Sequence, residues 1–273
     1  MKKAFAFLVV LLFAISLSAC CCLIDIPANP QEEQRFPQEQ IVIPQETEPP
    51  TEPATEPPTE PPQTEPEHSE YYIPGVSVED VIVYFNEVCL DAEFVSGGDP
   101  SRLQKWDIPI YYQLDGSYTQ EDLAVLTEFT AWLNTIEGFP GIYESGDLTP
   151  PNLRIFFCTQ QRMVELMGDN FYNMDGGVTF WYDYDRIYDA TICYRTDLSQ
   201  TVRNSVILEE IYNGLGPAQD TSLREDSIIF SGYSEPQALT AVDELLLRLL
   251  YHPEMQCGMD TAQCEAVIRQ LYY

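Results

Sequence analysis

The feature that most limits how this chain can fold is a repetitive segment with almost nothing to bury. Pro-Gln-Glu recurs three times between residues 30 and 46, and Thr-Glu-Pro recurs five times between residues 47 and 66. Such prolines and like charges favour an extended polyproline II chain over a packed core. At about 3.1 Å per residue, the segment could reach on the order of 100 Å. We therefore expect residues 21–70 to be a disordered tether and residues 71–273 to be the folded domain.

The first 20 residues have the form of a lipoprotein signal peptide. Lys2 and Lys3 precede an apolar run from Ala4 to Ser16, which is too short to span a bilayer as a helix. The run ends in Leu-Ser-Ala-Cys, small residues before Cys20, as in a bacterial lipobox. We expect lipid on Cys20, so that the protein is anchored to the cell membrane and faces outside the cytoplasm. The alternative is an ordinary secretory signal that happens to precede a cysteine.

The segment 71–273 is long enough for one domain with its own core, and its charge restricts its partners. It carries 32 Asp plus Glu against 10 Lys plus Arg, a net charge of −22, within a chain whose total is −31. A surface this acidic argues against nucleic acid and against docking onto anionic lipid. A cationic or metal-bridged partner fits such a surface, but solubility alone is the simpler explanation.

Hydrophobic periodicity predicts an α+β order of elements in this domain. The central prediction is a helix that Asp197-Leu198-Ser199-Gln200 opens with a capping-box pattern and that Gly214, Gly216 and Pro217 end. The other expected elements are helices over 77–89, 119–137, 160–167, 240–251 and 261–271, strands over 107–114 and 153–158, and a hairpin of strands 177–182 and 187–194.

The five cysteines of the domain do not form a disulfide framework, because their number is odd and their spacing is irregular. Cys158 and Cys193 lie in apolar strand-like runs, so we expect them to be core residues. Cys257 and Cys264 flank a predicted turn and could pair in an oxidising compartment. The remaining cysteine is Cys89.

The central helix carries polar side chains in an arc that is otherwise apolar. At about 100° per residue, Glu209, Asn213 and Glu210 project into one arc of roughly 100°, which two valines share. Isoleucines and leucines line the opposite side. A helix that is apolar on both sides is usually buried. We therefore expect these three polar side chains to enter a cleft or a polar network.

Three hypotheses account for these side chains. Adjacent carboxylates in a poorly solvated place raise one another's pKa, which suits general acids, or they bind a hard metal with further oxygen ligands such as Asp220. Alternatively, Glu209, Glu210, Asn213 and Asp220 recognise a ligand without chemistry. In the third hypothesis they hold the fold together, and Arg248, which projects from an otherwise apolar helix, pairs with Glu209 or Glu210.

Two other patterns have simpler explanations. Residues 173–177, Asn-Met-Asp-Gly-Gly, are similar to a calcium loop but lack the spacing and the final Glu of an EF-hand, so a turn explains them better. His252 precedes Pro253 at a predicted helix end, where the helix dipole favours a cation. We expect His252 to be a helix-terminus residue and not a metal ligand.

Several motifs follow one another along the domain in a recognisable order. Glu-Phe-Val-Ser-Gly-Gly-Asp at 93–99 precedes Lys-Trp and Ile-Pro-Ile, and Glu-Glu-Ile-Tyr-Asn-Gly-Leu-Gly at 209–216 precedes Asp220. Asp-Ser-Ile-Ile-Phe at 226–230 and the segment 239–259 complete the order. From Cys89 onward the chain thereby resembles domain-of-unknown-function family 2927, an uncharacterised group of exported bacterial proteins.

The resemblance implies a fold related to the zincins, the zinc-dependent peptidases. Segment 208–216 has the residue spacing of their H-E-x-x-H-x-L-G helix and keeps its Glu as Glu210. Glu209 and Asn213 stand where two histidines would bind zinc, and the whole chain contains only two histidines. The family prefers Gln at the position of Asn213. What is implied is a zincin-like α+β fold with a small mixed sheet, a long helix, a degenerate active-site helix and C-terminal helices, and no known reaction.

We therefore expect a lipid-anchored protein without zinc-dependent peptidase activity. It would bind a peptide, protein or cell-envelope ligand through Glu209, Glu210, Asn213 and Asp220. The enzyme alternative is a hydrolase that uses Glu209 and Glu210, with or without a hard divalent metal, and a third alternative is a structural envelope protein. We assign no catalytic residue and expect no cofactor. The expected partners are the membrane, through lipid on Cys20, and the unknown ligand.

Overall fold

The computed structural model describes residues 69–90 and 102–273. The predicted signal peptide, the lipid on Cys20 and the predicted tether up to residue 68 lie outside the described residues, as does the Glu-Phe-Val-Ser-Gly-Gly-Asp motif at 93–99. Within the two described ranges, no helix is both long and apolar enough to cross a membrane. Apart from Ser69 and Glu70, every described residue belongs to the predicted domain.

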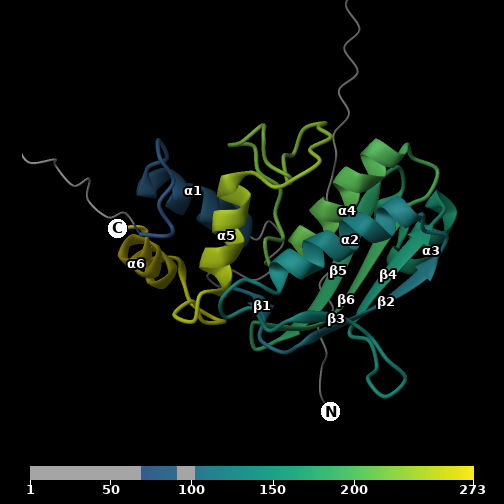
Figure 1. Cartoon of the computed structure of the whole chain (residues 1–273), viewed down its shortest axis with the longest axis horizontal. Coiled ribbons are helices and arrows are strands. Elements are labelled where there is room, and N and C mark those ends of the chain that lie inside the picture. Colours follow the sequence, from purple (N-terminus) through teal and green to yellow (C-terminus); the bar gives the residue numbers. More distant parts are fainter. Residues whose placement is uncertain (1–68, 91–101) are drawn as a thin grey trace, which may run out of the picture. The chain divides into compact units, whose positions relative to one another are not determined.

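Six strands form one sheet whose pairs are parallel except for a single antiparallel pair (Figure 1). The strands are β1 (Lys105–Trp106), β2 (Ile110–Gly116), β3 (Ile142–Glu144), β4 (Leu153–Cys158), β5 (Gly176–Asp183) and β6 (Arg186–Arg195). The parallel part runs β6, β4, β2, β3, with β1 paired to the start of β6. β5 is antiparallel to β6, and in the described part of the chain it pairs with no other strand.

Alternating burial explains the register of the sheet. Along β4, buried and half-buried residues alternate, as expected for a strand with one face in a core. Buried Leu153 and Ile155 stand opposite Ala190 and Ile192 of β6, which are buried as well. The sheet therefore has one continuous apolar face.

Six helices accompany the sheet. They are α1 (Val78–Cys89), α2 (Gln120–Leu133), α3 (Gln160–Met167), α4 (Gln200–Gly214), α5 (Ala241–Tyr251) and α6 (Thr261–Tyr272). α2 and α4 lie side by side over the apolar face, and α1, α5 and α6 group together beside the sheet (Figure 1). α3 covers the opposite face, because Gly177 of β5 contacts Met163 whereas its neighbour Gly176 contacts α4.

These elements confirm the expected mixture of helices and sheet and refine its layout. The structure is a mixed α/β domain with a largely parallel sheet. β4 and α3 have the bounds that the sequence predicts, and the predicted 177–194 hairpin corresponds to β5 and β6. β1 and β3, of two and three residues, were not predicted, because a strand this short shows no periodicity.

The start of α4 differs from the prediction. Its N-cap is Ser199, whose side chain accepts a hydrogen bond from the backbone N–H of Val202, and there is no capping box. Asp197 is not part of the cap, because it pairs with Arg195 at 2.9 Å. Asp197 and Ser199 both lie in the motif that opens the predicted helix. The ion pair with Arg195 occupies the carboxylate of Asp197, and Ser199 caps the helix.

Hydrogen bonds from β1 and α5 hold the end of α4. The indole Nε1 of Trp106 donates to the carbonyl of Gly214 at 2.9 Å, and the hydroxyl of Tyr251 donates to the carbonyl of Leu215 at 2.7 Å. These bonds satisfy carbonyls that a helix end leaves without partners. Gly216 then turns the chain with φ +131°, where a Cβ would lie 2.6 Å from a backbone oxygen. The direction in which the chain leaves α4 is therefore fixed.

The cysteines of the described ranges are free thiols. The suggested pair of Cys257 and Cys264 is not formed: Cys264 is fully buried, and Cys257 donates to the backbone oxygen of Lys105 at 3.7 Å. Burial raises the pKa of Cys264 to about 12. Cys193 is a core residue as predicted, and Cys158 is half-buried.

Candidate functional site

The structure brings the four predicted site residues together. Glu209, Glu210 and Asn213 lie on α4, and Asp220 lies on the segment that follows it. Asp220 is close enough to both glutamates to raise their pKa, and the amide of Asn213 lies beside Asp220. We call these four residues the α4 site. Helical spacing predicted the three residues on α4, and the resemblance alone suggested that Asp220 belongs with them.

Hydrogen bonds hold the residues that directly follow Asp220 in place. Thr221 accepts a hydrogen bond from the N–H of Ser231 and donates its own N–H to Ile229, both at 2.9 Å. Glu87 of α1 accepts from the hydroxyl of Thr221 and from the N–H of Ser222. Asp220 therefore directly precedes Thr221, whose backbone and side chain are hydrogen-bonded, and α1 helps to set its position.

β5 bounds the α4 site on another side. A Cβ atom on Gly176 would lie 2.8 Å from Oε1 of Glu210 and 2.4 Å from Cγ1 of Val206. Only glycine permits so close an approach of strand and helix. The carboxyl of Glu210 therefore lies directly against the β5 backbone.

The polar groups of the α4 site are buried or half-buried and lack partners in the described part of the chain. Glu210 is 6 % exposed and Asn213 is 1 % exposed. Both amide atoms of Asn213 and Oδ1 of Asp220 have no hydrogen bond of acceptable geometry. Within residues 69–90 and 102–273, the side chains of Glu209 and Glu210 form neither a hydrogen bond nor an ion pair. Because buried polar groups in proteins are nearly always hydrogen-bonded, three unpartnered atoms on neighbouring side chains are unusual. The other unpartnered buried atoms of the described residues lie singly, on Asn86, Thr179, Arg203 and Arg224.

Burial shifts the ionisation of all three carboxyls in the same direction. It raises the pKa of Glu209 and Glu210 well above the usual range, and the neighbouring carboxylates raise both further. The pKa of Asp220 rises to about 7, although the adjacent Asn213 amide lowers it somewhat without completing a hydrogen bond. The α4 site can therefore hold protons near neutral pH.

A fourth carboxylate near the site was missed in the sequence. Asp175, immediately before β5, raises the pKa of Glu209, and burial raises its own pKa although Arg195 pairs with it at 3.1 Å. It belongs to the Asn-Met-Asp-Gly-Gly stretch that we interpreted as a turn. The paired glycines were the available signal, because Gly176 marks the contact with α4.

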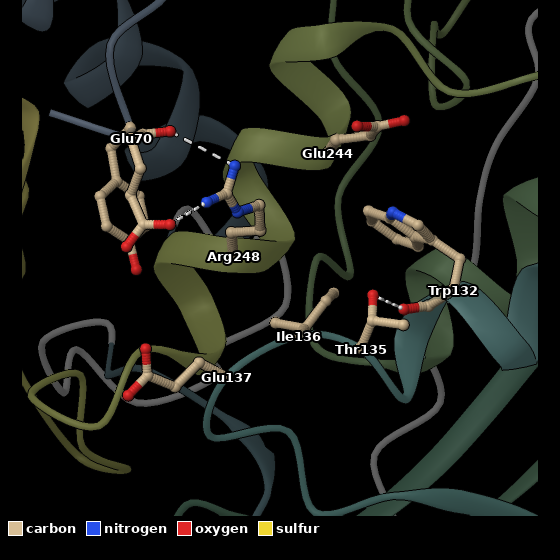
Figure 2. A pocket seen from close by; sticks show the side chains of 8 residues that line it. Glu70, Trp132, Thr135, Ile136, Glu137, Glu244 and Arg248 are labelled. Carbon is tan, nitrogen blue, oxygen red and sulfur yellow. Dashed lines mark hydrogen bonds and ion pairs between the residues drawn. The ribbon is translucent and has the colours of Figure 1, made fainter. Parts of the chain in front are cut away.

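Arg248 does not pair with Glu209 or Glu210, so that prediction is wrong. Its guanidinium donates to the carboxylate of Glu70 at 2.8 Å and lies over the ring of Tyr71 (Figure 2). Helical periodicity showed that Arg248 needs an acceptor but gave no information on which distant segment supplies it. The acceptor comes from the residues that lead into the domain.

The Glu70–Arg248 pair borders a separate cavity of about 300 Å³ (Figure 2). None of the α4 site residues lines it. Glu137 and Glu244 at its rim are exposed, so water solvates their charges. The lining residues are Glu70, Tyr71, Trp132, Thr135, Ile136, Glu137, Glu244 and Arg248.

No metal centre is apparent among the described residues. In residues 69–90 and 102–273, no three His, Cys, Asp or Glu side chains converge in a way that could hold a metal ion. His252 is the C-cap residue of α5, as the sequence predicted, and its Nδ1 accepts from the N–H of Glu254 at 3.2 Å. What the α4 site offers is a set of free oxygen acceptors that exchange protons.

Comparison with known proteins agrees with the order of motifs. A family model described as "Protein of unknown function (DUF2927)" matches residues 79–270. No curated protein matches the chain, and no solved structure does. The matched range contains every residue of the α4 site and covers well over half of the 273 residues. The chain therefore belongs to the DUF2927 family.

Proposed function

We propose that this protein binds a peptide, protein or cell-envelope ligand through Glu209, Glu210, Asn213 and Asp220. One observation carries the proposal: these side chains lie together, two buried and two half-buried, and in the described part of the fold no hydrogen bond or ion pair satisfies the carboxyls of Glu209 and Glu210 or the amide of Asn213. An unsatisfied buried carboxylate destabilises a protein. Stability of this kind is usually given up at functional sites, where a ligand supplies the missing partners.

The proposal includes the location of the protein. Lipid on Cys20 would anchor it to the membrane with the domain facing outside the cytoplasm, and the Pro/Thr/Glu-rich tether would hold the domain away from the lipid. The supporting observations are the lipobox-like end of the apolar run and the composition of the tether. Envelope polymers and exported proteins are the ligands that a domain in this position would meet.

We also propose that the fold is zincin-like with a remodelled active helix. The support is the antiparallel β5 strand packed against α4 beside a parallel sheet, together with the residue pattern of α4. Glu209 and Asn213 replace the histidines that zinc requires, so the expected activity is not that of a zinc peptidase. No cofactor is part of this proposal.

A pelleting assay with isolated cell-wall fragments tests the binding function. The full chain, purified in detergent, should bind the fragments, and Glu209→Gln and Asp220→Asn should each reduce that binding at least ten-fold. Glu137→Gln removes an exposed carboxylate distant from α4 and should bind as the wild type does. Binding that is absent in the wild type, or equal in all four proteins, would reject the proposal.

A second candidate function is a hydrolase that uses Glu209 and Glu210. The raised pKa of these carboxyls favours it, because a general acid must hold its proton near neutral pH. The same fragments separate the two functions. An enzyme would release soluble products at a rate that falls at least 100-fold in Glu210→Gln, whereas a binding protein would release none.

A further inference from the structure

We infer that the group which enters the α4 site is a protonated amine, such as a lysine side chain or an amino group of an envelope polymer. This inference rests on the proposed binding function and names the chemistry of the ligand. It depends on the acceptors in the site, on the absence of a free cation nearby among the described residues, and on the close approach of β5 to Glu210.

The unpartnered atoms are mainly acceptors. The carboxylates of Glu209, Glu210 and Asp220 accept hydrogen bonds when ionised, and the carbonyl oxygen of Asn213 accepts as well. Asn213 is 1 % exposed and its amide lies beside Asp220, so it faces the cluster and not solvent. An ammonium group carries one positive charge and three donors, which complements these acceptors.

The cations around α4 are already paired. From α2, Asp122 binds Arg203 of α4 itself, and before β5, Asp175 binds Arg195. Arg195 also pairs with Asp197 at 2.9 Å. No arginine or lysine of the described ranges is among the charged groups that shift the pKa of Glu209, Glu210 or Asp220.

The other titratable groups that face the site are neutral. β6 supplies Tyr194, whose hydroxyl donates to a carbonyl of α4 at 3.2 Å, and Cys193. Burial raises the pKa of Tyr194, and the Cys158 thiol followed by burial raises that of Cys193. Neither contributes a charge at neutral pH, so a positive charge must come from the ligand.

The space favours a compact cation. β5 closes one side of the α4 site, because a Cβ on Gly176 would lie 2.8 Å from Oε1 of Glu210. On the remaining sides, the compact charge and slender stem of a lysine need less room than the broad planar fork of a guanidinium. The carboxylates do not converge in a metal-binding arrangement within the described residues. An ammonium nitrogen lies about 2.9 Å from each acceptor, farther than a metal ion does, and one or two acceptors are enough to hold it.

Binding of an amine should release protons from the carboxyls of the α4 site. In the free protein, burial keeps protons on part of the three carboxyls near neutral pH. An entering ammonium favours their ionised forms, so protons leave as the ligand binds. Affinity should therefore rise between pH 5 and pH 8, a dependence that a purely structural role would not produce.

Isothermal titration with a blocked Ala-Lys-Ala peptide and its Nε-acetylated copy tests the inference on the full chain. We expect the free amine to bind at least ten-fold tighter than the acetylated peptide at pH 7. Titrations in buffers of different ionisation enthalpy should show net proton release. Glu209→Gln and Asp220→Asn should each weaken binding at least ten-fold, whereas Glu137→Gln should not, and a melting temperature at or above that of the wild type would verify folding.

The inference fails if neither peptide binds, if both bind equally, if no proton is released, or if Mg²⁺ or Ca²⁺ occupies the site and excludes the lysine peptide. Its failure is distinguishable from failure of the binding function. Cell-wall fragments with acetylated amines would still bind in a manner that depends on Asp220 if only the identity of the group were wrong. If untreated fragments did not bind at all, the binding function itself would fail.

Discussion

Two buried carboxyl clusters in this domain differ in how fully their hydrogen bonds are made. At the start of α5, Asp243 is fully buried and accepts hydrogen bonds from Tyr84 at 2.9 Å, Ser227 at 2.7 Å and the hydroxyl of Thr240 at 2.8 Å. Its Oδ2 also accepts backbone N–H groups. Glu210 on α4 is almost as buried and accepts none in the described part of the chain.

The difference separates a cluster whose hydrogen bonds hold the fold together from the cluster that we propose binds a ligand. Asp243 ties together α1, α5 and the loop that carries Ser227, so its charge is stabilised by donors from three places. The carboxyls of the α4 site are buried or half-buried but have no such hydrogen-bond donors among the described residues. Both clusters lie within the matched range of the DUF2927 family, so their geometry distinguishes them where the family match alone does not.

The pH dependence of stability should give the largest effect. The pKa of Asp220 is about 7 in the folded domain against an ordinary 3.8. A raised folded-state pKa contributes stability that is complete below pH 3.8 and is lost as pH rises through about 7. At about 1.4 kcal/mol per pKa unit, the loss is on the order of 4 kcal/mol.

Urea unfolding of the full chain between pH 4 and 8 measures this loss. Carboxyls with lowered pKa, such as Glu79 and Asp197, act in the opposite direction, so the comparison is made against Asp220→Asn. The variant should lose less stability than the wild type over this range. Parallel curves would show that Asp220 does not hold a raised pKa.

Removing a hydrogen-bond acceptor from the cluster around Asp243 should lower the free energy of unfolding by nearly as much as the pH change does. Asp243→Asn keeps the size of the side chain but replaces an acceptor oxygen by a donor, which we expect to lower the free energy of unfolding by about 3 kcal/mol. Asp80 is the matched control, because it occupies the same capping-box position at the start of α1 but is exposed. A loss in Asp243→Asn no greater than in Asp80→Asn would remove the contrast between the clusters.

The unsatisfied cluster should respond with the opposite sign. Glu210→Gln removes a buried charge that has no partner, so the free energy of unfolding should rise by about 2 kcal/mol at pH 8. The gain should shrink at pH 5, where the wild-type carboxyl holds its proton. Glu137→Gln should remain within about 0.5 kcal/mol of the wild type. If Glu210→Gln were destabilised instead, Glu210 would stabilise the fold as Asp243 does.

The smallest effect concerns the contact between β5 and α4. Gly176→Ala would place a methyl group against Glu210 and Val206, and the adjustment should cost about 1 to 2 kcal/mol. Gly146→Ala is the control, since a Cβ there meets no atom within 4 Å. Thermal unfolding of the two variants compares them directly, and equal melting temperatures would mean that β5 and α4 are not closely packed.

The sequence predicts the regular part of this domain because local signals determine it. Alternation of buried residues marks β4, and Thr159, whose side chain caps α3 by accepting from the N–H of Arg162, precedes the predicted start of that helix. The arc shared by Glu209, Asn213 and Glu210 likewise follows from helical geometry. The partner of Arg248 and the proximity of Asp175 depend on how distant segments pack, which no local pattern contains.

The contacts around Glu70 also determine how the domain would carry a mechanical load. Tension on the chain ahead of Ser69 would enter through the Glu70–Arg248 pair on α5 and through the hydroxyl of Tyr272 on α6, which donates to the carbonyl of Val76 at 2.7 Å. The two C-terminal helices would bear the pull as a shear across several bonds. α4 meets this route through Tyr251 and through the hydroxyl of its own Tyr212, which donates to the carbonyl of Asp243 at 2.9 Å, so part of the pull would reach the helix that carries the carboxylates.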